Sequence, residues 1–161
     1  MSVVVSDASA LINLARVDQF ELLTALYGQI VIPQAVYDEV VVQGRGRDGS
    51  REVKDASWIE VQAPKDELAV RALAAELGKG EASAIILAQE LQAALLLIDE
   101  IRGRRVAQQL ELKVRGTLGI LARAKREGRI SSLRQVLDLL RARGTWIGQD
   151  LYEDVLHLVG E

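Results

Sequence analysis

Two apolar segments of this chain each end on an aspartate, and the two aspartates lie far apart in the sequence. Asp7 follows Val3-Val4-Val5-Ser6, and Asp99 follows Leu95-Leu96-Leu97-Ile98. Apolar runs of this length are typical of strands buried on both faces of a parallel sheet. The carboxyl ends of parallel strands share one edge, where α/β folds place their ligand sites. The two carboxylates can therefore meet in one crevice, which suggests a bound divalent metal.

Two more carboxylates are placed to reach the same edge. Glu39 lies in a helix that begins at Pro33, directly after a strand over 30–32, and Glu81 opens a helix after Gly78-Lys79-Gly80. Helices that follow parallel strands start at the edge where those strands end. We therefore expect Glu39 and Glu81 to join Asp7 and Asp99 in one cleft.

Carboxylates that converge repel one another unless cations neutralise them. Their hard oxygen ligands suit Mg²⁺ or Mn²⁺. One or two such ions would bind a phosphodiester, lower the pKa of a bound water and stabilise the leaving oxygen. This chemistry needs no histidine base. His157, the only histidine, lies in the last predicted helix, where a surface or packing role is expected.

Each acid also has an explanation that involves no ligand. Asp7 and Asp99 could cap the helices that follow them, Glu81 could favour a helix N-terminus, and Glu39 could be exposed. The placement of all four on one predicted edge favours the metal site. Glu100 could add a ligand or point away from the site.

Short polar side chains lie near the same edge, and they could orient ligands or water. Caps and turns explain them equally well. They are Ser6, Ser9, Asn13 and Thr117.

Five strands are predicted, separated by helical patterns. The segments 59–61 and 112–115 alternate apolar and polar residues, which is typical of half-exposed strands at sheet edges. The other three, over 3–5, 30–32 and 95–98, are apolar throughout. Alternating strands and helices predict an α/β fold with right-handed crossovers. If the first and fourth strands are central neighbours, Asp7 and Asp99 lie at the topological switch point.

The bulk composition limits the class of protein. A chain of 161 residues, 49% hydrophobic and 27% charged, predicts one globular domain. Apolar residues at helical spacing predict a helical pair over about 131–161. The absence of cysteine excludes disulfides and thiolate sites. No apolar run is long enough for a membrane span, and no signal peptide is evident, so a cytoplasmic location is expected.

The net charge of −3 argues against a protein that coats nucleic acid by charge alone. Residues 101–130 nevertheless hold nine basic residues against Glu111 and Glu127. This segment follows the second acidic strand end, so Arg102, Arg104 and Arg105 could hold an anionic substrate beside the metal. A solvated helix face is the alternative.

Two other segments are less informative about chemistry. Residues 43–51 contain a literal G-x-G-x-x-G, but no strand precedes it and no dinucleotide site is expected. The arginines of this segment could contact substrate, but a solvated loop is the favoured interpretation. In the C-terminal pair, Ser131 or Ser132 can cap the first helix, and Trp146 and Tyr152 are expected to pack the pair onto the domain or a second subunit.

Five short stretches within residues 1 to about 125 resemble the PIN domain family. The C-terminal pair resembles an extension in one prokaryotic PIN subfamily. The matching stretches are Ser6-Asp7-Ala8-Ser9-Ala10-Leu11-Ile12, Ile32-Pro33-Gln34-Ala35-Val36-Tyr37-Asp38-Glu39-Val40, Gly80-Glu81-Ala82-Ser83-Ala84, Leu97-Ile98-Asp99-Glu100 and Gly116-Thr117-Leu118-Gly119.

The resemblance implies a five-stranded parallel sheet flanked by helices, in three α/β/α layers. It also implies a Mg²⁺- or Mn²⁺-dependent endoribonuclease, with Asp7, Glu39, Glu81 and Asp99 as catalytic metal ligands. Many relatives are toxins of type II toxin–antitoxin pairs, which implies an RNA substrate, a small antitoxin partner and a homodimer. Many members carry aspartate at the position of Glu81, and the fourth acid could align with Asp99 or Glu100.

Two rival functions remain. A phosphatase of the haloacid dehalogenase type also begins with a strand that ends in aspartate, but it requires a second aspartate where this chain has Ser9. A PIN-like module that binds RNA or a protein without turnover is the other rival. Stabilisation of the fold by Mn²⁺ would distinguish an intact metal site from such a module.

Overall fold

A computed structural model describes residues 2–161. Five parallel strands form one sheet in the order β3-β2-β1-β4-β5, which confirms the predicted five-stranded parallel sheet. The strands are β1 Val4–Ser6, β2 Ile30–Pro33, β3 Ile59–Gln62, β4 Leu95–Leu97 and β5 Val114–Arg115.

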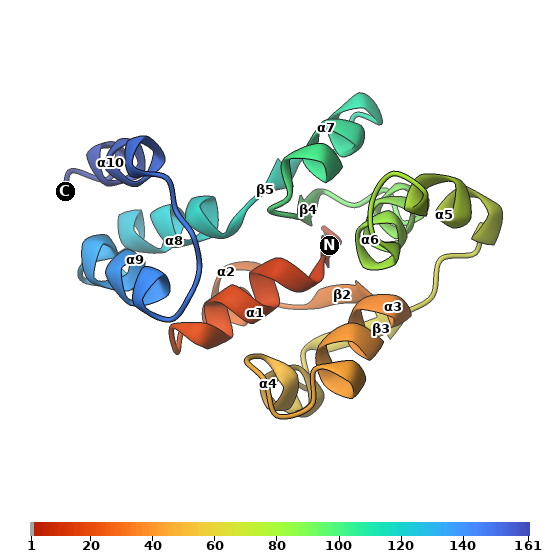
Figure 1. The fold of residues 1–161 in the computed structure, drawn as a ribbon, viewed down its shortest axis with the longest axis horizontal. Helices are drawn as coiled ribbons and strands as arrows, with labels where there is room; N and C mark the ends of the chain where they lie inside the picture. Colours follow the sequence, from red (N-terminus) through yellow and green to blue (C-terminus); the bar gives the residue numbers. More distant parts are fainter. Residues whose placement is uncertain (1) are drawn as a thin grey trace.

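Helices connect and cover the strands (Figure 1). They are α1 Ala8–Arg16, α2 Leu22–Tyr27, α3 Gln34–Tyr37, the π-helix η1 Asp38–Gln43, α4 Ser50–Asp55, α5 Glu67–Ala74, α6 Lys79–Glu90, α7 Ile101–Gln109, α8 Thr117–Arg126, α9 Leu133–Ala142 and α10 Gln149–Leu158.

The order of the strands follows from their sequence patterns. The apolar strands β2, β1 and β4 occupy the centre, and the two alternating strands lie at the edges, as predicted. Val5 of β1 pairs with Val31 of β2 and with Leu96 of β4. The sheet order reverses between β1 and β4, so Asp7 and Asp99 lie at the switch point.

Successive residues of β1 point to opposite faces of the sheet, and each face has its own core. Val4 packs in the cluster that holds α1, α2 and α8, whereas Val5 packs in the cluster that holds α6. In Figure 1, α5 and α6 lie on the right of the sheet, and α8, α9 and α10 form a group on the left. The three layers of the predicted architecture are therefore present.

The C-terminal helices share the larger core. Leu133, Leu137 and Leu140 of α9 and Tyr152 of α10 are buried in the same cluster as Leu11 of α1. The Oγ atom of Ser132 caps α9 by accepting the N–H of Gln135 at 3.2 Å, which decides between the two predicted serines. Glu161 accepts the N–H of Leu133 at 2.6 Å and so joins the two ends of the pair.

Two expectations concern residues outside the sheet. Within this chain Trp146 does not pack onto the domain, because it is 87% exposed in the segment between α9 and α10. The segment 43–51 is exposed over residues 45–48, as expected of a solvated loop, but its end is buried at Gly49 and Ser50 against α1 and η1. Among residues 2–161, no helix is long and apolar enough to cross a membrane.

Candidate metal centre

Asp7 is a buried carboxyl group at the carboxyl end of β1. Only 3% of the residue is exposed, and its N–H donates to the carbonyl of Leu97 at 2.9 Å, which extends the pairing of β1 with β4. Burial raises the pKa of Asp7 from its ordinary value of 3.8 to about 7. The N–H of Ala8 lowers this pKa, while the charges of Glu81, Glu39 and Asp99 raise it further. Asp7 is therefore a carboxyl group surrounded by other acids.

Glu39 and Glu81 share a small cavity with Asp7. This acidic cavity has a volume of about 240 Å³ and lies between the start of α1, the η1 segment and the start of α6. A Cβ atom on Gly80 would lie 2.9 Å from Glu39 Oε1 and 3.6 Å from Asp7 Oδ1. Because glycine has no side chain, the carboxylates of Glu39 and Asp7 can approach the space beside Gly80 from different elements.

Glu39 reaches the cavity from a helix of unusual geometry. The helix expected to run on from Pro33 is an α-helix only over Gln34–Tyr37, and Glu39 lies in the π-helix η1. Single π-helical turns are rare and are found frequently at functional sites, because the wider turn changes the direction of the side chains. Burial raises the pKa of Glu39 above its ordinary value of 4.5.

Glu81 lies in the first turn of α6 and faces Glu100 at the start of α7. Burial raises the pKa of Glu81, and the charge of Glu100 raises this pKa further. Burial alone would raise the pKa of Glu100 too, but the backbone N–H groups of Arg102 and Gly103, together with Glu81, lower it. The charge of Glu100 therefore disfavours ionisation of Glu81.

Glu100 is the residue that caps α7. Its Oε2 atom accepts the N–H of Gly103 at 3.1 Å, so the capping role considered for Asp99 belongs to its neighbour. A Cβ on Gly103 would lie 3.0 Å from Glu81 Oε2, so this glycine lets α7 approach the acid. Within residues 2–161, that Oε2 atom is buried and has no hydrogen-bond partner.

Asp99 lies at the same sheet edge but turns toward α8 and α1. Its Oδ1 atom accepts the N–H of Thr117 at 2.6 Å, and its Oδ2 atom accepts the Thr117 hydroxyl at 2.6 Å. The Asn13 amide donates to Oδ2 at 3.2 Å. Asp99 lines a second cavity of about 560 Å³, next to the one that Asp7, Glu39 and Glu81 share. Three of the four predicted acids therefore share one cavity, and the fourth is held beside it.

Three observations show that these residues fit a divalent cation. The donors are carboxylate oxygens, which Mg²⁺ and Mn²⁺ prefer. The pKa values of Asp7, Glu39 and Glu81 are all raised, so a cation would relieve the cost of ionising them. Glu81 Oε2 is a buried oxygen without a partner. As the side chains stand in the described part of the chain, no three acids or histidines are close enough to hold an ion.

Comparison with known proteins decides the family. A family profile described as a PIN domain matches residues 3–161. The chain belongs to the PIN domain family. No protein among the curated ones matches it. A PilT N-terminus domain protein from the hyperthermophilic archaeon Sulfolobus solfataricus P2 has a solved structure that is similar at a TM-score of 0.47 and 17% identity, over 91% of this chain and 97% of that chain.

Four short polar side chains of this PIN domain lie near the acids. The Ser6 hydroxyl is buried and donates to the carbonyl of Asp7 at 2.8 Å, and Ser9 lines the acidic cavity. Asn13 and Thr117 both donate to Asp99. Thr145 was not predicted to lie near the site, but its hydroxyl donates to Asn13 Oδ1 at 3.0 Å. No local signal marks it, because the contact joins the turn before α10 to α1.

The three arginines predicted to hold substrate lie on α7 of the PIN domain, in different surroundings. Arg104 is half-buried and lines the cavity that Asp99 also lines. Arg102 is exposed, and its charge lowers the pKa of Glu100. Arg105 is exposed and lines neither of the two cavities. Of the three, Arg104 is therefore the one that shares a cavity with a predicted acid.

Proposed function

We propose that this PIN domain is a metal-dependent endoribonuclease that hydrolyses phosphodiester bonds in single-stranded RNA. The observation that carries the proposal is the acidic cavity, where Asp7, Glu39 and Glu81 all have raised pKa values. Members of this family are commonly metal-dependent nucleases. RNA as the substrate rests on the family resemblance.

The side chains of the cavity have distinct roles in this proposal. Asp7, Glu39 and Glu81 would hold Mg²⁺ or Mn²⁺, with Asp99 as the fourth acid at the sheet edge. A bound ion of this kind supplies an activated water and neutralises charge on the phosphate and the leaving oxygen. Thr117 and Asn13 keep Asp99 in one orientation through hydrogen bonds to both of its oxygens.

Protons compete with the cation for these oxygens. Burial raises the pKa of Asp7 to about 7 and also raises the pKa of Glu81. The carboxylates must lose these protons before they can act as ligands, so metal binding should strengthen as pH rises. His157, the only histidine, is exposed on α10 and is not assigned a role.

The test is cleavage of end-labelled single-stranded RNA with and without Mn²⁺. The wild type should cut only with Mn²⁺, and Asp7→Asn should not cut. Asp150→Asn is the matched control, because it removes the same charge from an exposed position on α10. Full activity in both Asp7→Asn and Asp99→Asn would overturn the proposal.

The alternative is a PIN domain that binds RNA or a protein without cutting. The unpartnered oxygen of Glu81 and the raised pKa of Asp7 argue against a site that has lost its metal function. An intact site should raise the melting temperature with Mn²⁺ by mass action. No cleavage together with no Mn²⁺ effect would favour the binding module.

We also propose, from the family resemblance, that the protein is the toxin of a type II toxin–antitoxin pair, acts as a homodimer and is inhibited by a small antitoxin. Induced expression in a bacterial host should then arrest growth, while Asp7→Asn should not. A neighbouring short reading frame whose product relieves the arrest would identify the antitoxin. Growth that is equal with wild type and Asp7→Asn would contradict the toxin role.

A further inference from the structure

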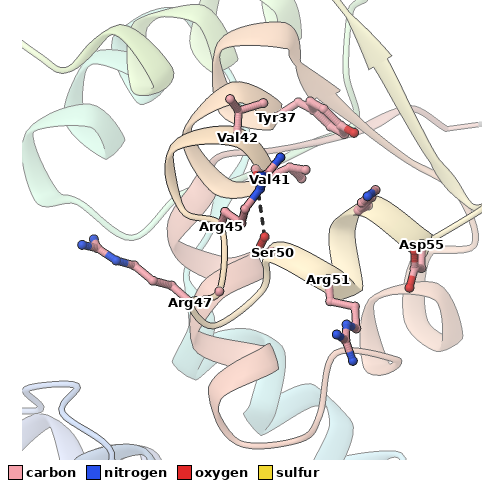
Figure 2. Close-up of a pocket in the computed structure, with 10 residues that line it drawn as sticks. Tyr37, Val41, Val42, Arg45, Arg47, Ser50, Arg51 and Asp55 are labelled. Carbon is pink, nitrogen blue, oxygen red and sulfur yellow. Dashed lines mark hydrogen bonds between the residues drawn. The ribbon is translucent and has the colours of Figure 1, made fainter.

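A second hollow lies against η1, the segment that also lines the acidic cavity. It has a volume of about 790 Å³ and lies between η1, the turn that follows it and α4 (Figure 2). Its walls carry four cations, Arg45, Arg47, Arg51 and Lys54, against one acid, Asp55. This hollow, named here the basic groove, contrasts with the net charge of −3 of the whole chain. Its positive charge is therefore a local feature.

The four cations of the basic groove are not used by the fold. All four residues are exposed, and within residues 2–161 none of them has an acidic side chain within ion-pair distance. Asp48, an acid of the same turn, instead lies 3.0 Å from Arg16 on α1. Cations gathered without counter-charges attract an anionic ligand.

The wall of the basic groove is fixed by packing against the rest of the protein. The Ser50 hydroxyl donates to the carbonyl of Val41 at 3.4 Å and ties α4 to η1. Gly49 has a φ of +88°, and a Cβ there would lie 3.5 Å from the Cα of Ile12 on α1. Val53 of α4 is buried in the core. The groove is therefore formed before any ligand arrives, so less ordering free energy is lost on binding.

The basic groove and the acidic cavity are both lined by residues of η1. Glu39 and Gln43 of η1 line the acidic cavity, whereas Val41 and Val42 of the same six residues line the basic groove. A strand whose phosphate lies at the acids can therefore cross η1 and enter the groove. Val42 is 58% exposed, and with Tyr37 it offers apolar surface to a base.

From this arrangement we infer that the basic groove binds the sugar–phosphate backbone of the RNA strand beside the bond that is cut. The identity of the strand rests on the proposed function, but its binding can be measured without cleavage. Four cations against one acid favour a polyanion over a protein segment, for which an apolar face is the usual anchor. An acidic polypeptide is the competing ligand, and the experiment includes it.

The experiment uses the full chain carrying Asp7→Asn, with a chelator present, so that no RNA is cut. Fluorescence anisotropy with a labelled oligouridine of about 16 nucleotides gives the dissociation constant across a series of KCl concentrations. The groove variant is Arg47→Gln with Arg51→Gln. The control variant is Lys65→Gln with Arg71→Gln, which removes the same charge from exposed positions outside both the basic groove and the acidic cavity.

The groove variant should bind RNA on the order of tenfold more weakly near 0.1 M salt, and its salt slope should fall by about 1.4, since each contact to a single strand contributes about 0.7. The control variant should match the parent. Equal binding by the groove and control variants would overturn the inference. A groove variant that loses affinity for labelled polyglutamate but keeps its affinity for RNA would also overturn the inference.

A second measurement separates this inference from the proposed function. With Asp7 restored and Mn²⁺ present, the groove variant should cut a long RNA less efficiently than wild type, through a higher KM. It should cut a dinucleotide at the wild-type rate, because its one phosphodiester bond lies at the acids and leaves no second phosphate for the groove. If wild type cuts neither RNA, the proposed function fails, while the anisotropy result still decides the inference.

Discussion

Asn13 and Asp99 are joined by a hydrogen bond of 3.2 Å, although one lies on α1 and the other follows β4. The same Asn13 side chain accepts the Thr145 hydroxyl at 3.0 Å, and Arg16 donates to Thr145 at 2.6 Å. The turn between α9 and α10 therefore contacts the acidic edge of the sheet through one amide. The C-terminal helices thus help to orient Asp99.

The first prediction concerns this amide. Asn13→Ala removes one of the hydrogen bonds that orient Asp99, and loss of such an outer partner typically costs about 10- to 100-fold in metal affinity or activity. We expect a weaker Mn²⁺ effect on melting temperature and slower RNA cleavage, with the fold retained. Gln108→Ala, at an exposed position of α7, is the control. Wild-type Mn²⁺ affinity in Asn13→Ala would show that the amide does not position the acid.

The second prediction concerns stability and pH without divalent ions. The pKa of Asp7 is about 7 in the folded protein and near 3.8 when unfolded. The folded state therefore binds more protons between these values, and stability must fall as pH rises through them. The full difference corresponds to about 4 kcal/mol. Urea unfolding in chelator should give a lower free energy of unfolding near pH 8 than near pH 5.

Asp7→Asn tests the origin of this pH dependence. The amide has nearly the same shape and does not ionise, so the variant should be more stable than wild type near pH 8, and its stability should change less with pH. Asp150→Asn should follow the wild-type curve, because this acid is exposed on α10. A wild-type pH dependence in Asp7→Asn would show that other groups cause it.

The third prediction separates the two neighbouring acids Glu81 and Glu100. Glu81→Gln should lose most of the stabilisation by Mn²⁺, because Glu81 lines the acidic cavity with Asp7. Glu100→Ala should keep this stabilisation and lose about 1 kcal/mol of stability, the usual effect of removing a helix cap. Thermal melts with and without Mn²⁺ measure both effects. If Glu100→Ala loses the Mn²⁺ effect while Asp99→Asn keeps it, Glu100 is the fourth ligand.

The fourth prediction compares two large apolar side chains of the C-terminal segment. Leu137 is fully buried in the core shared with α1, so Leu137→Ala should lower the free energy of unfolding by about 2–5 kcal/mol. Trp146 is 87% exposed, so Trp146→Ala should change it by less than about 0.5 kcal/mol. Urea unfolding of both variants is the measurement. A Leu137→Ala variant as stable as Trp146→Ala would show that α9 adds little to the common core.

The local sequence was sufficient to predict the sheet and the placement of the two aspartates. Unbroken apolar runs before Asp7 and Asp99 predict buried strands, and alternation in 59–61 and 112–115 predicts edges. The strand order confirms both. These features are predictable because a strand buried on both faces is apolar throughout, whereas a strand buried on one face alternates apolar and polar residues.

Tertiary structure alone decided the directions of the acidic side chains and the contacts between distant segments. Asp99 turns to Thr117, Glu39 enters the cavity from a π-helix, and Thr145 meets Asn13. The basic groove likewise depends on how α4 packs against η1. Periodicity reports which face of an element is apolar, but it carries no information on which residues of two distant elements meet. That is decided when the elements pack, because the geometry of the whole core sets their relative positions.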